Sequence, residues 1–266
     1  LNDQIRPQDD FDNYANSLWK KAHPIPDDQV SWGSFRIMID DTRKNLKDLL
    51  ERSDVPSAYQ KVVDFYKSGL NTELIEQQGI SPLDAFFTEL KQISEKSELL
   101  TFIAKLPSYG ISSFFHIYAE ADADEPDHEI PYLFTGGLGL PDKDYYFQQK
   151  RAEIRDKYRQ FITQLLQLTG ISEENAKTQA ELIFKLELQL AEHTPLNYER
   201  SDPSKYFHKI FLTTLNEWTP TLDWNGFFQN FTNKEIPFVS IDRKDFYQTM
   251  ATILDQSSLD HLKIFL

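Results

Sequence analysis

The amino-acid sequence predicts a mainly α-helical fold into which one small β-hairpin is inserted. Glycine accounts for only 9 of the 266 residues, and this leaves few positions for the positive φ angles that hairpin-rich β folds require. Apolar residues recur three or four positions apart through most of the chain, which is the period of an amphipathic helix. A single region changes to compact, aromatic-rich runs of strand length.

The first part of the chain is dominated by helical stripes. Residues 11–19, 35–50, 57–68 and 95–106 each place apolar side chains on one face, so we expect four helices there. Gly69 is expected to end the third helix, because glycine accepts the left-handed conformation that often follows a helix. Ser81, Pro82 and Asp84 indicate a further helix start: serine can cap, proline fits the first position, and an acid favours the positive end.

The pattern changes in the middle of the chain. Phe114 to Ala119 and Ile130 to Thr135 are predicted to be two strands of a hairpin, joined by the acidic stretch Glu120 to Glu129. Because short segments with prolines follow between Pro195 and Pro237, we predict no long element there. The chain shows neither a tandem repeat nor a low-complexity linker, so the sequence indicates no internal domain boundary.

Helices return on both sides of this irregular stretch. Residues 154–168, the segment after Ser172, and residues 245–255 and 258–266 have the helical period. Gly170 is expected to end the first of these helices and Ser172 to cap the second. The apolar face of the second is predicted to consist of Ile183, Leu186 and Leu190.

Charge and cysteine content exclude several classes of function. The formal net charge is −14, from 42 acidic and 28 basic residues, and such a surface repels nucleic acids and anionic membranes. The chain has no cysteine, which excludes disulfides and thiolate metal ligands. Its apolar runs are shorter than the ~20 residues that cross a bilayer, so no membrane span is expected. The compartment stays open between bacterial cytoplasm, periplasm and secretion.

The histidine spacing does not fit a zinc peptidase site. Such a site needs two histidines one helical turn apart, with a glutamate between them that activates the metal-bound water. The six histidines are His23, His116, His128, His193, His208 and His261, and no two lie four positions apart. After His128-Glu129, Tyr132 stands where the second histidine should be, and Pro131 would interrupt a helix. We therefore expect no catalytic and no metal-ligating residue in this chain.

The acidic stretch resembles a calcium loop only loosely. Asp122, Asp124, Asp127 and Glu129 are suitable oxygen ligands, but an EF-hand loop also needs a central glycine and a distal glutamate. Pro126 falls close to the position of that glycine. The favoured interpretation is a solvated hairpin tip.

Other patterns also favour structural roles. Gly136 to Gly139 follow a predicted strand, as in a phosphate-binding loop, but neither Lys-Ser nor Lys-Thr comes after them. A turn that serves the fold is the favoured interpretation. No Gly-x-Ser-x-Gly elbow occurs. The aromatic residues, 14% of the chain, could line a peptide groove, but we expect them mainly to pack helices together.

Four stretches resemble the neprilysin-type (M13) zinc metallopeptidases. They are Arg6 to Trp19 (RPQDDFDNYANSLW); Ile25-Pro26 followed by Trp32 to Phe35 (WGSF); Gly137 to Tyr146 (GLGLPDKDYY); and Leu190-Ala191 followed by Arg200 to Pro203 (RSDP) and Leu222 to Trp224 (LDW). Their order and spacing match the family over essentially the whole chain. The third stretch, called the signature loop below, is the most specific.

The resemblance implies that residues 1–266 are the N-terminal helical cap region of such an enzyme, incomplete at its C-terminus. In this family the cap faces a thermolysin-like catalytic domain, and the two enclose a chamber that admits oligopeptides. The zinc-binding helix belongs to the second half of these proteins, which this chain lacks. The full-length protein would be a zinc endopeptidase or oligopeptidase, and this chain alone would be inactive. A non-catalytic helical module that binds peptides or proteins is the alternative.

Departures from the family pattern bear on the substrate. Gln8 stands where many secreted members have a cysteine, which favours a bacterial enzyme. Ser31 and Ile39 take the places of arginines that help mammalian relatives hold the C-terminal carboxylate of the substrate. Arg36 and Arg43 are the nearby cations, so they are the candidates for substrate binding. A dipeptide-releasing preference does not carry over.

Two expectations concern packing. Tyr145 and Tyr146, which close the signature loop, should pack into the cap. The last predicted helix carries Leu262, Phe265 and Leu266 without a glycine or polar tail after it, and burying each such side chain is worth about 1.5–3 kcal/mol. We expect residues of a longer polypeptide, or a second copy, to cover this face, so that Leu266 is not a natural domain end.

Overall fold

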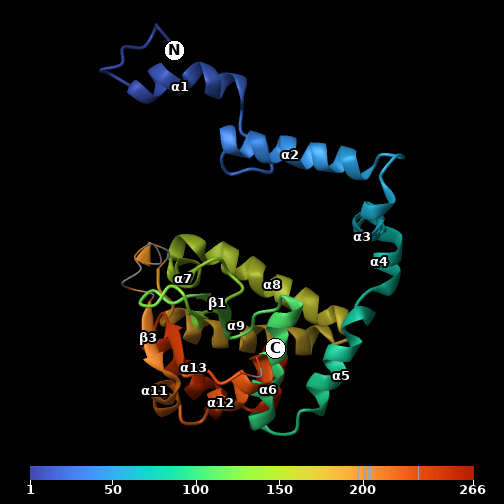
Figure 1. Ribbon diagram of the computed structural model, residues 1–266, viewed down its shortest axis with the longest axis vertical. Helices are drawn as coiled ribbons and strands as arrows, with labels where there is room; N and C mark the ends of the chain where they lie inside the picture. Colours follow the sequence, from blue (N-terminus) through green and yellow to red (C-terminus); the bar gives the residue numbers. More distant parts are fainter. Residues whose placement is uncertain (197, 200–201, 203–204, 206, 233) are drawn as a thin grey trace. The chain divides into compact units, whose positions relative to one another are not determined.

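The computed structural model describes residues 1–196, 198–199, 202, 205, 207–232 and 234–266. They form two compact units, Leu1–Gly79 (unit 1) and Ile80–Leu266 (unit 2). The sequence does not indicate this division, because one helix ends at Gln78 and the next helical turn begins at Ser81 without a linker between them. The prediction of a mainly helical fold is confirmed (Figure 1).

Unit 1 contains amphipathic helices with little interior. Its helices are α1 (Phe11–Ala22), α2 (Ser34–Leu50), α3 (Gln60–Leu70) and α4 (Thr72–Gln78), with a 3-10 turn at Ser57–Tyr59. Gly69 lies inside α3 and does not end it. Val63 is the buried apolar residue of this unit among those described, while Phe35 and Phe65 are 83% and 82% exposed. The apolar stripes of α2 and α3 therefore face solvent.

Unit 2 holds the remaining elements. The helices are α5 (Asp84–Gln92), α6 (Lys96–Lys105), α7 (Lys143–Phe147), α8 (Ala152–Leu168), α9 (Glu173–Glu192), α11 (Leu212–Trp218), α12 (Trp224–Thr232), α13 (Lys244–Gln256) and α14 (Leu259–Phe265); 3-10 turns lie at Ser81–Leu83, Leu106–Tyr109 and Gln149–Arg151. The long helices α8 and α9 pack side by side (Figure 1). Within the described residues, no helix combines the length and apolar character needed to cross a bilayer.

A four-stranded sheet stands where the sequence predicts two strands. The strands are β1 (Phe115–Ala121), β2 (Glu129–Thr135), β3 (His208–Phe211) and β4 (Phe238–Ile241), in the order β1-β2-β4-β3. The predicted hairpin is confirmed as the antiparallel pair β1 and β2. β4 adds parallel to β2, and β3 adds antiparallel to β4. The prediction misses β3 and β4 because four residues are too few to establish a period of two.

The core lies between the sheet and helices α6, α12 and α13, and aromatic rings fill it. The ring of Phe115 on β1 lies 5.4 Å from that of Trp224 and 5.5 Å from that of Phe227, centroid to centroid. Tyr247 on α13 meets Trp224 edge to face at 6.2 Å. Such tilted contacts are the favoured geometry for aromatic pairs. These rings serve helix and sheet packing, as the sequence predicts.

Helix ends are fixed by side chains, though not always by the predicted ones. A capping box of Glu95 and Glu98 starts α6. Ser81 and Ser172 make no side-chain cap; Ser172 occupies the N-cap position of α9 without that hydrogen bond. Gly170, with φ of 87°, follows α8 as predicted.

The apolar face of the last helix is covered in part by its own chain. Ile264, Phe265 and Leu266 are only half-buried, so the expectation that another segment or a second copy covers this face stays a prediction. Leu262 is fully buried, and the ring of Phe265 packs against that of Phe114 at 4.6 Å. Leu266 also packs against the main core. The nitrogen of Lys263 donates to the carbonyls of Lys91 and Ile93, at the end of α5.

Candidate functional site

The signature loop and Gly136 just before it lie directly on β1 and α9, and their glycines allow this approach. A β-carbon on Gly136 would lie 2.9 Å from the Cα of Phe115. Gly137 has φ of 71°, and a β-carbon there would lie 2.8 Å from a methyl group of Leu190. Both distances are shorter than carbon atoms tolerate. The interpretation of Gly136 to Gly139 as a turn that serves the fold is confirmed.

A buried carboxylate holds the loop together. Glu187 on α9 is only 4% exposed, and it accepts hydrogen bonds from the hydroxyls of Tyr146 at 2.7 Å and Tyr158 at 2.6 Å. The Tyr146 hydroxyl in turn accepts the N–H of Leu140 at 3.1 Å. One carboxylate thus connects α7, α8, α9 and the loop. Hydrogen bonding of this kind is what allows a charge to be buried.

The electrostatics agree with a structural role. Burial raises the pKa of Glu187, while the hydrogen bonds from both tyrosines and from the Gly139 backbone act against that rise. Burial, followed by the negative charge of Glu187, raises the pKa of Tyr146 and of Tyr158, so both phenols remain protonated donors. Tyr146 is 3% exposed and cannot reach a substrate. The prediction that Tyr146 packs into the interior is confirmed, and Tyr145 is half-buried against the same cluster.

The sequence pattern does not predict the role of Glu187. The buried residues of α9 are Ala176, Ala180, Phe184, Glu187, Leu190 and Ala191. Ile183 and Leu186, assigned to the apolar face, are only half-buried. The sequence does contain a signal for this role. Glu187 lies three positions after Phe184 and four positions before Ala191, so it falls inside the buried stripe of α9.

The histidines are dispersed. His128 is exposed at the hairpin tip, with Nε2 3.9 Å from Glu125, and His193 follows α9, with Nδ1 3.1 Å from an oxygen of Asp245. Within the described part of the chain, no three histidine, aspartate or glutamate side chains form a group that could hold a metal. These residues therefore do not fit a catalytic zinc ion.

The acids of the hairpin tip do not converge either. Asp122 is buried and forms an ion pair with Lys209 of β3, and it also accepts the N–H of Asp124 at 3.0 Å. The hydrogen bond from Lys209 lowers the pKa of Asp122. Asp124, Asp127 and Glu129 are exposed, which agrees with a solvated tip.

The two candidate substrate-binding arginines both lie on α2 in unit 1. Arg36 and Arg43 are exposed, and Arg43 stands 4.0 Å from Asp40. Their assignment to substrate binding remains a prediction. The RSDP stretch contains Arg200, Ser201 and Pro203, which lie outside the described residues.

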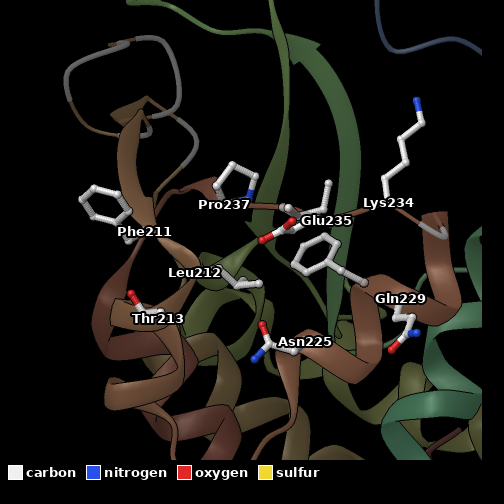
Figure 2. Close-up of a pocket in the computed structure, with 10 residues that line it drawn as sticks. Phe211, Leu212, Thr213, Asn225, Gln229, Lys234, Glu235 and Pro237 are labelled. Atoms are coloured by element: carbon white, nitrogen blue, oxygen red, sulfur yellow. The ribbon is translucent and has the colours of Figure 1, made fainter.

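A surface groove of about 620 Å³ lies beside β3. Its lining residues are Phe211, Leu212, Thr213, Asn225, Phe228, Gln229, Lys234, Glu235, Ile236 and Pro237. Leu212 and Phe228 are buried. The exposed side chains of Asn225 and Gln229 project from α12 (Figure 2). Such a groove can accept an apolar group, but its lining does not combine a nucleophile with a base.

Sequence comparison decides the family. Residues 7–266 match the model of peptidase family M13. The chain belongs to peptidase family M13. This confirms the resemblance carried by the four stretches.

The M13 chain is similar to longer proteins. It is 27% identical over 275 residues to endothelin-converting enzyme 1 of Cavia porcellus, which covers 96% of this chain and 36% of that protein. It is also 27% identical over 257 residues to neprilysin-11 of Caenorhabditis elegans, covering 89% and 30%. The chain therefore spans about a third of the length of these relatives.

Solved structures share the fold. The zinc metalloprotease Zmp1 of Mycobacterium tuberculosis, in complex with an inhibitor, matches with a TM-score of 0.89 at 22% identity, over 100% of this chain and 42% of that one. PepO of Lactobacillus rhamnosis matches with a TM-score of 0.77 at 20% identity, over 98% and 42%. At these identities the likeness establishes only the fold of the M13 chain and not its function.

Proposed function

We propose that this chain is the substrate-admitting region of a zinc-dependent endopeptidase or oligopeptidase, and that the catalytic zinc is held by other residues of a longer polypeptide. One observation carries the proposal: residues 7–266 match family M13 while covering about a third of the relatives. Residues 1–266 would thus be the N-terminal cap region, without catalytic residues of their own.

The contacts within the chain support a structural role for this region, with catalysis carried out by other residues. Residues of the signature loop hold α7, α8 and α9 together through Glu187. A helical wall of this kind would contribute shape, which would limit how large a substrate can enter. The proposed role is therefore steric admission of oligopeptides, with the bond-breaking step supplied elsewhere.

The exposed apolar residues of unit 1 also support the proposal. Phe35, Met38 and Leu46 on α2, and Phe65 on α3, are all more than half exposed. Exposed apolar stripes of this extent mark surfaces that another protein segment covers. We propose that the catalytic region of the longer polypeptide covers α2, and that Arg36 on this helix then meets the substrate carboxylate.

The test compares the 266-residue chain with the longer polypeptide. Both are treated with a mild chelator, supplied with zinc, and assayed for bound metal and for cleavage of oligopeptides and of a folded protein. The longer polypeptide should bind one zinc and cleave only the peptides; the 266-residue chain should do neither. Tight zinc binding by the 266-residue chain, or a longer polypeptide without His-Glu-x-x-His, would refute the proposal. The latter result would favour a non-catalytic binding module.

A further inference from the structure

β1 is an edge strand of the sheet in unit 2. The strand order is β1-β2-β4-β3, and among the described strands β1 pairs only with β2. Its second half, from Tyr118 to Ala121, is exposed, with Tyr118 49% exposed. An edge strand offers backbone donors and acceptors to any extended chain that approaches it. The partner that this edge fits can be worked out from its register and charge.

The register identifies one pair that exchanges no backbone hydrogen bonds. In an antiparallel ladder, such pairs alternate with pairs that exchange both bonds. Thr135 stands opposite Phe115, but its N–H donates to Asp242 at 2.8 Å. Asp242 follows β4, which lies on the other side of β2. Phe115 and Thr135 are therefore a non-hydrogen-bonded pair.

Alternation extends this result along β1. Ile117 opposite Leu133, and Ala119 opposite Pro131, are also non-hydrogen-bonded pairs. Pro131 fits such a position because it has no N–H to donate toward β1. Ile117 and Ala119 consequently direct their N–H and C=O groups to the outer edge of the sheet.

This edge lacks three of the usual sequence protections. Edge strands are commonly guarded by lysine, proline or a bulge, whereas β1 reads FHIYAEA and pairs with β2 residue by residue. Ala119 and Ala121 carry small side chains, which leave the approach to the backbone open. Glu120 is the charged residue of the strand.

Negative charge surrounds the exposed end of this edge. Glu120, Asp124, Glu125, Asp127 and Glu129 are all exposed at the hairpin tip. The tip also includes Asp122, which Lys209 neutralises, and His128, which lies 3.9 Å from Glu125. The excess of carboxylates repels an acidic strand and attracts a basic one.

We propose that the outer edge of β1 binds an extended cationic peptide by strand addition. The peptide backbone pairs with Ile117 and Ala119, and its lysine or arginine side chains approach the carboxylates of the hairpin tip. The proposal rests on the proposed function for the choice of a peptide as occupant. It assigns to the admitting region a preference for basic substrates.

Binding to the 266-residue chain tests this directly. The probe is a fluorescein-labelled peptide of about ten residues with alternating lysine and threonine, and its match replaces each lysine with glutamate. Ala119→Pro removes an outward N–H at a place where edge strands tolerate proline; Ala119→Val keeps that N–H and is the control. Anisotropy gives the Kd, and hydrogen exchange follows the amides of Ile117 and Ala119.

The lysine peptide should bind, more weakly at high salt, and should slow exchange at both amides. Ala119→Pro should raise its Kd about tenfold, the effect of one or two lost hydrogen bonds, and Ala119→Val should not. If the Ala119→Pro variant fails to fold, the test is whether the lysine peptide slows hydrogen exchange at the Ile117 and Ala119 amides of the unsubstituted chain. Equal Kd for both variants, unchanged exchange, tight binding of the glutamate peptide, or protection by a second copy would each overturn the proposal. None of these results involves zinc or cleavage, so the proposed function is tested separately.

Discussion

The hydroxyl of Tyr158 donates to an oxygen of Glu187 at 2.6 Å, and it stands 1.8 Å from where a β-carbon on Gly139 would lie. The glycine and the carboxylate therefore depend on one another. The loop can approach α8 only without a side chain at this position, and the approach brings the Gly139 backbone into hydrogen-bonding range of Glu187. This contact explains why the signature loop needs its second Gly-Leu step.

Gly139→Ala should destabilise unit 2 by about 1–3 kcal/mol, the usual effect of overpacking. Tyr158 cannot move aside without losing its bond to Glu187. Urea denaturation measures the change. Adding Tyr158→Phe should restore only part of the loss, because the ring carbon next to the hydroxyl would still lie 2.6 Å from the new methyl group. Wild-type stability of the single variant would show that the loop adjusts freely.

Tyr146→Ala should lower the free energy of unfolding by about 3 kcal/mol, because it removes a buried ring together with its hydrogen bonds to Glu187 and Leu140. The neighbouring Phe147 is 47% exposed, so Phe147→Ala is the matched control and should have a much smaller effect. The assignment fails if both variants unfold at the same urea concentration, or if Tyr146→Ala alters peptide binding while leaving stability unchanged.

Glu187 should make stability depend on pH. Burial raises its pKa in the folded state, so the folded protein binds this proton more tightly than the unfolded chain does. The resulting stabilisation is fully present below the ordinary glutamate pKa of about 4.3 and is lost as pH rises through the raised folded value. The Glu187→Gln variant has no ionisable group at this position. Its free energy of unfolding, relative to that of the wild type, should therefore increase as the pH rises through this range. Parallel pH profiles for the two proteins would contradict this.

Arg36→Gln in the longer polypeptide should reduce kcat/KM about tenfold or more for peptides with a free C-terminal carboxylate, as expected for a lost charge-assisted hydrogen bond. Peptides with an amidated C-terminus should be unaffected. Arg43 stands near Asp40, so Arg43→Gln is the comparison and should have a smaller effect. Equal losses with free and amidated peptides would assign Arg36 to folding of α2.

The family and the helical character could be predicted from local sequence, because both depend on residues close together in the chain. The stripe of α2, the capping position of Gly170 and the hairpin of β1 and β2 are local in this sense. β3 and β4 could not be predicted, since each is four residues long and becomes a strand only by pairing with residues far away in the sequence.

The roles of single side chains divide in the same way. By itself the sequence determined that the signature loop must turn, that Tyr146 packs inside, and that the histidine spacing does not fit a His-Glu-x-x-His zinc site. The tertiary structure alone decided that Glu187 is the partner of Tyr146 and Tyr158, and that the last helix buries Leu262 in its own core. Those contacts join segments separated by many residues, and their energies depend on distances that no local pattern contains.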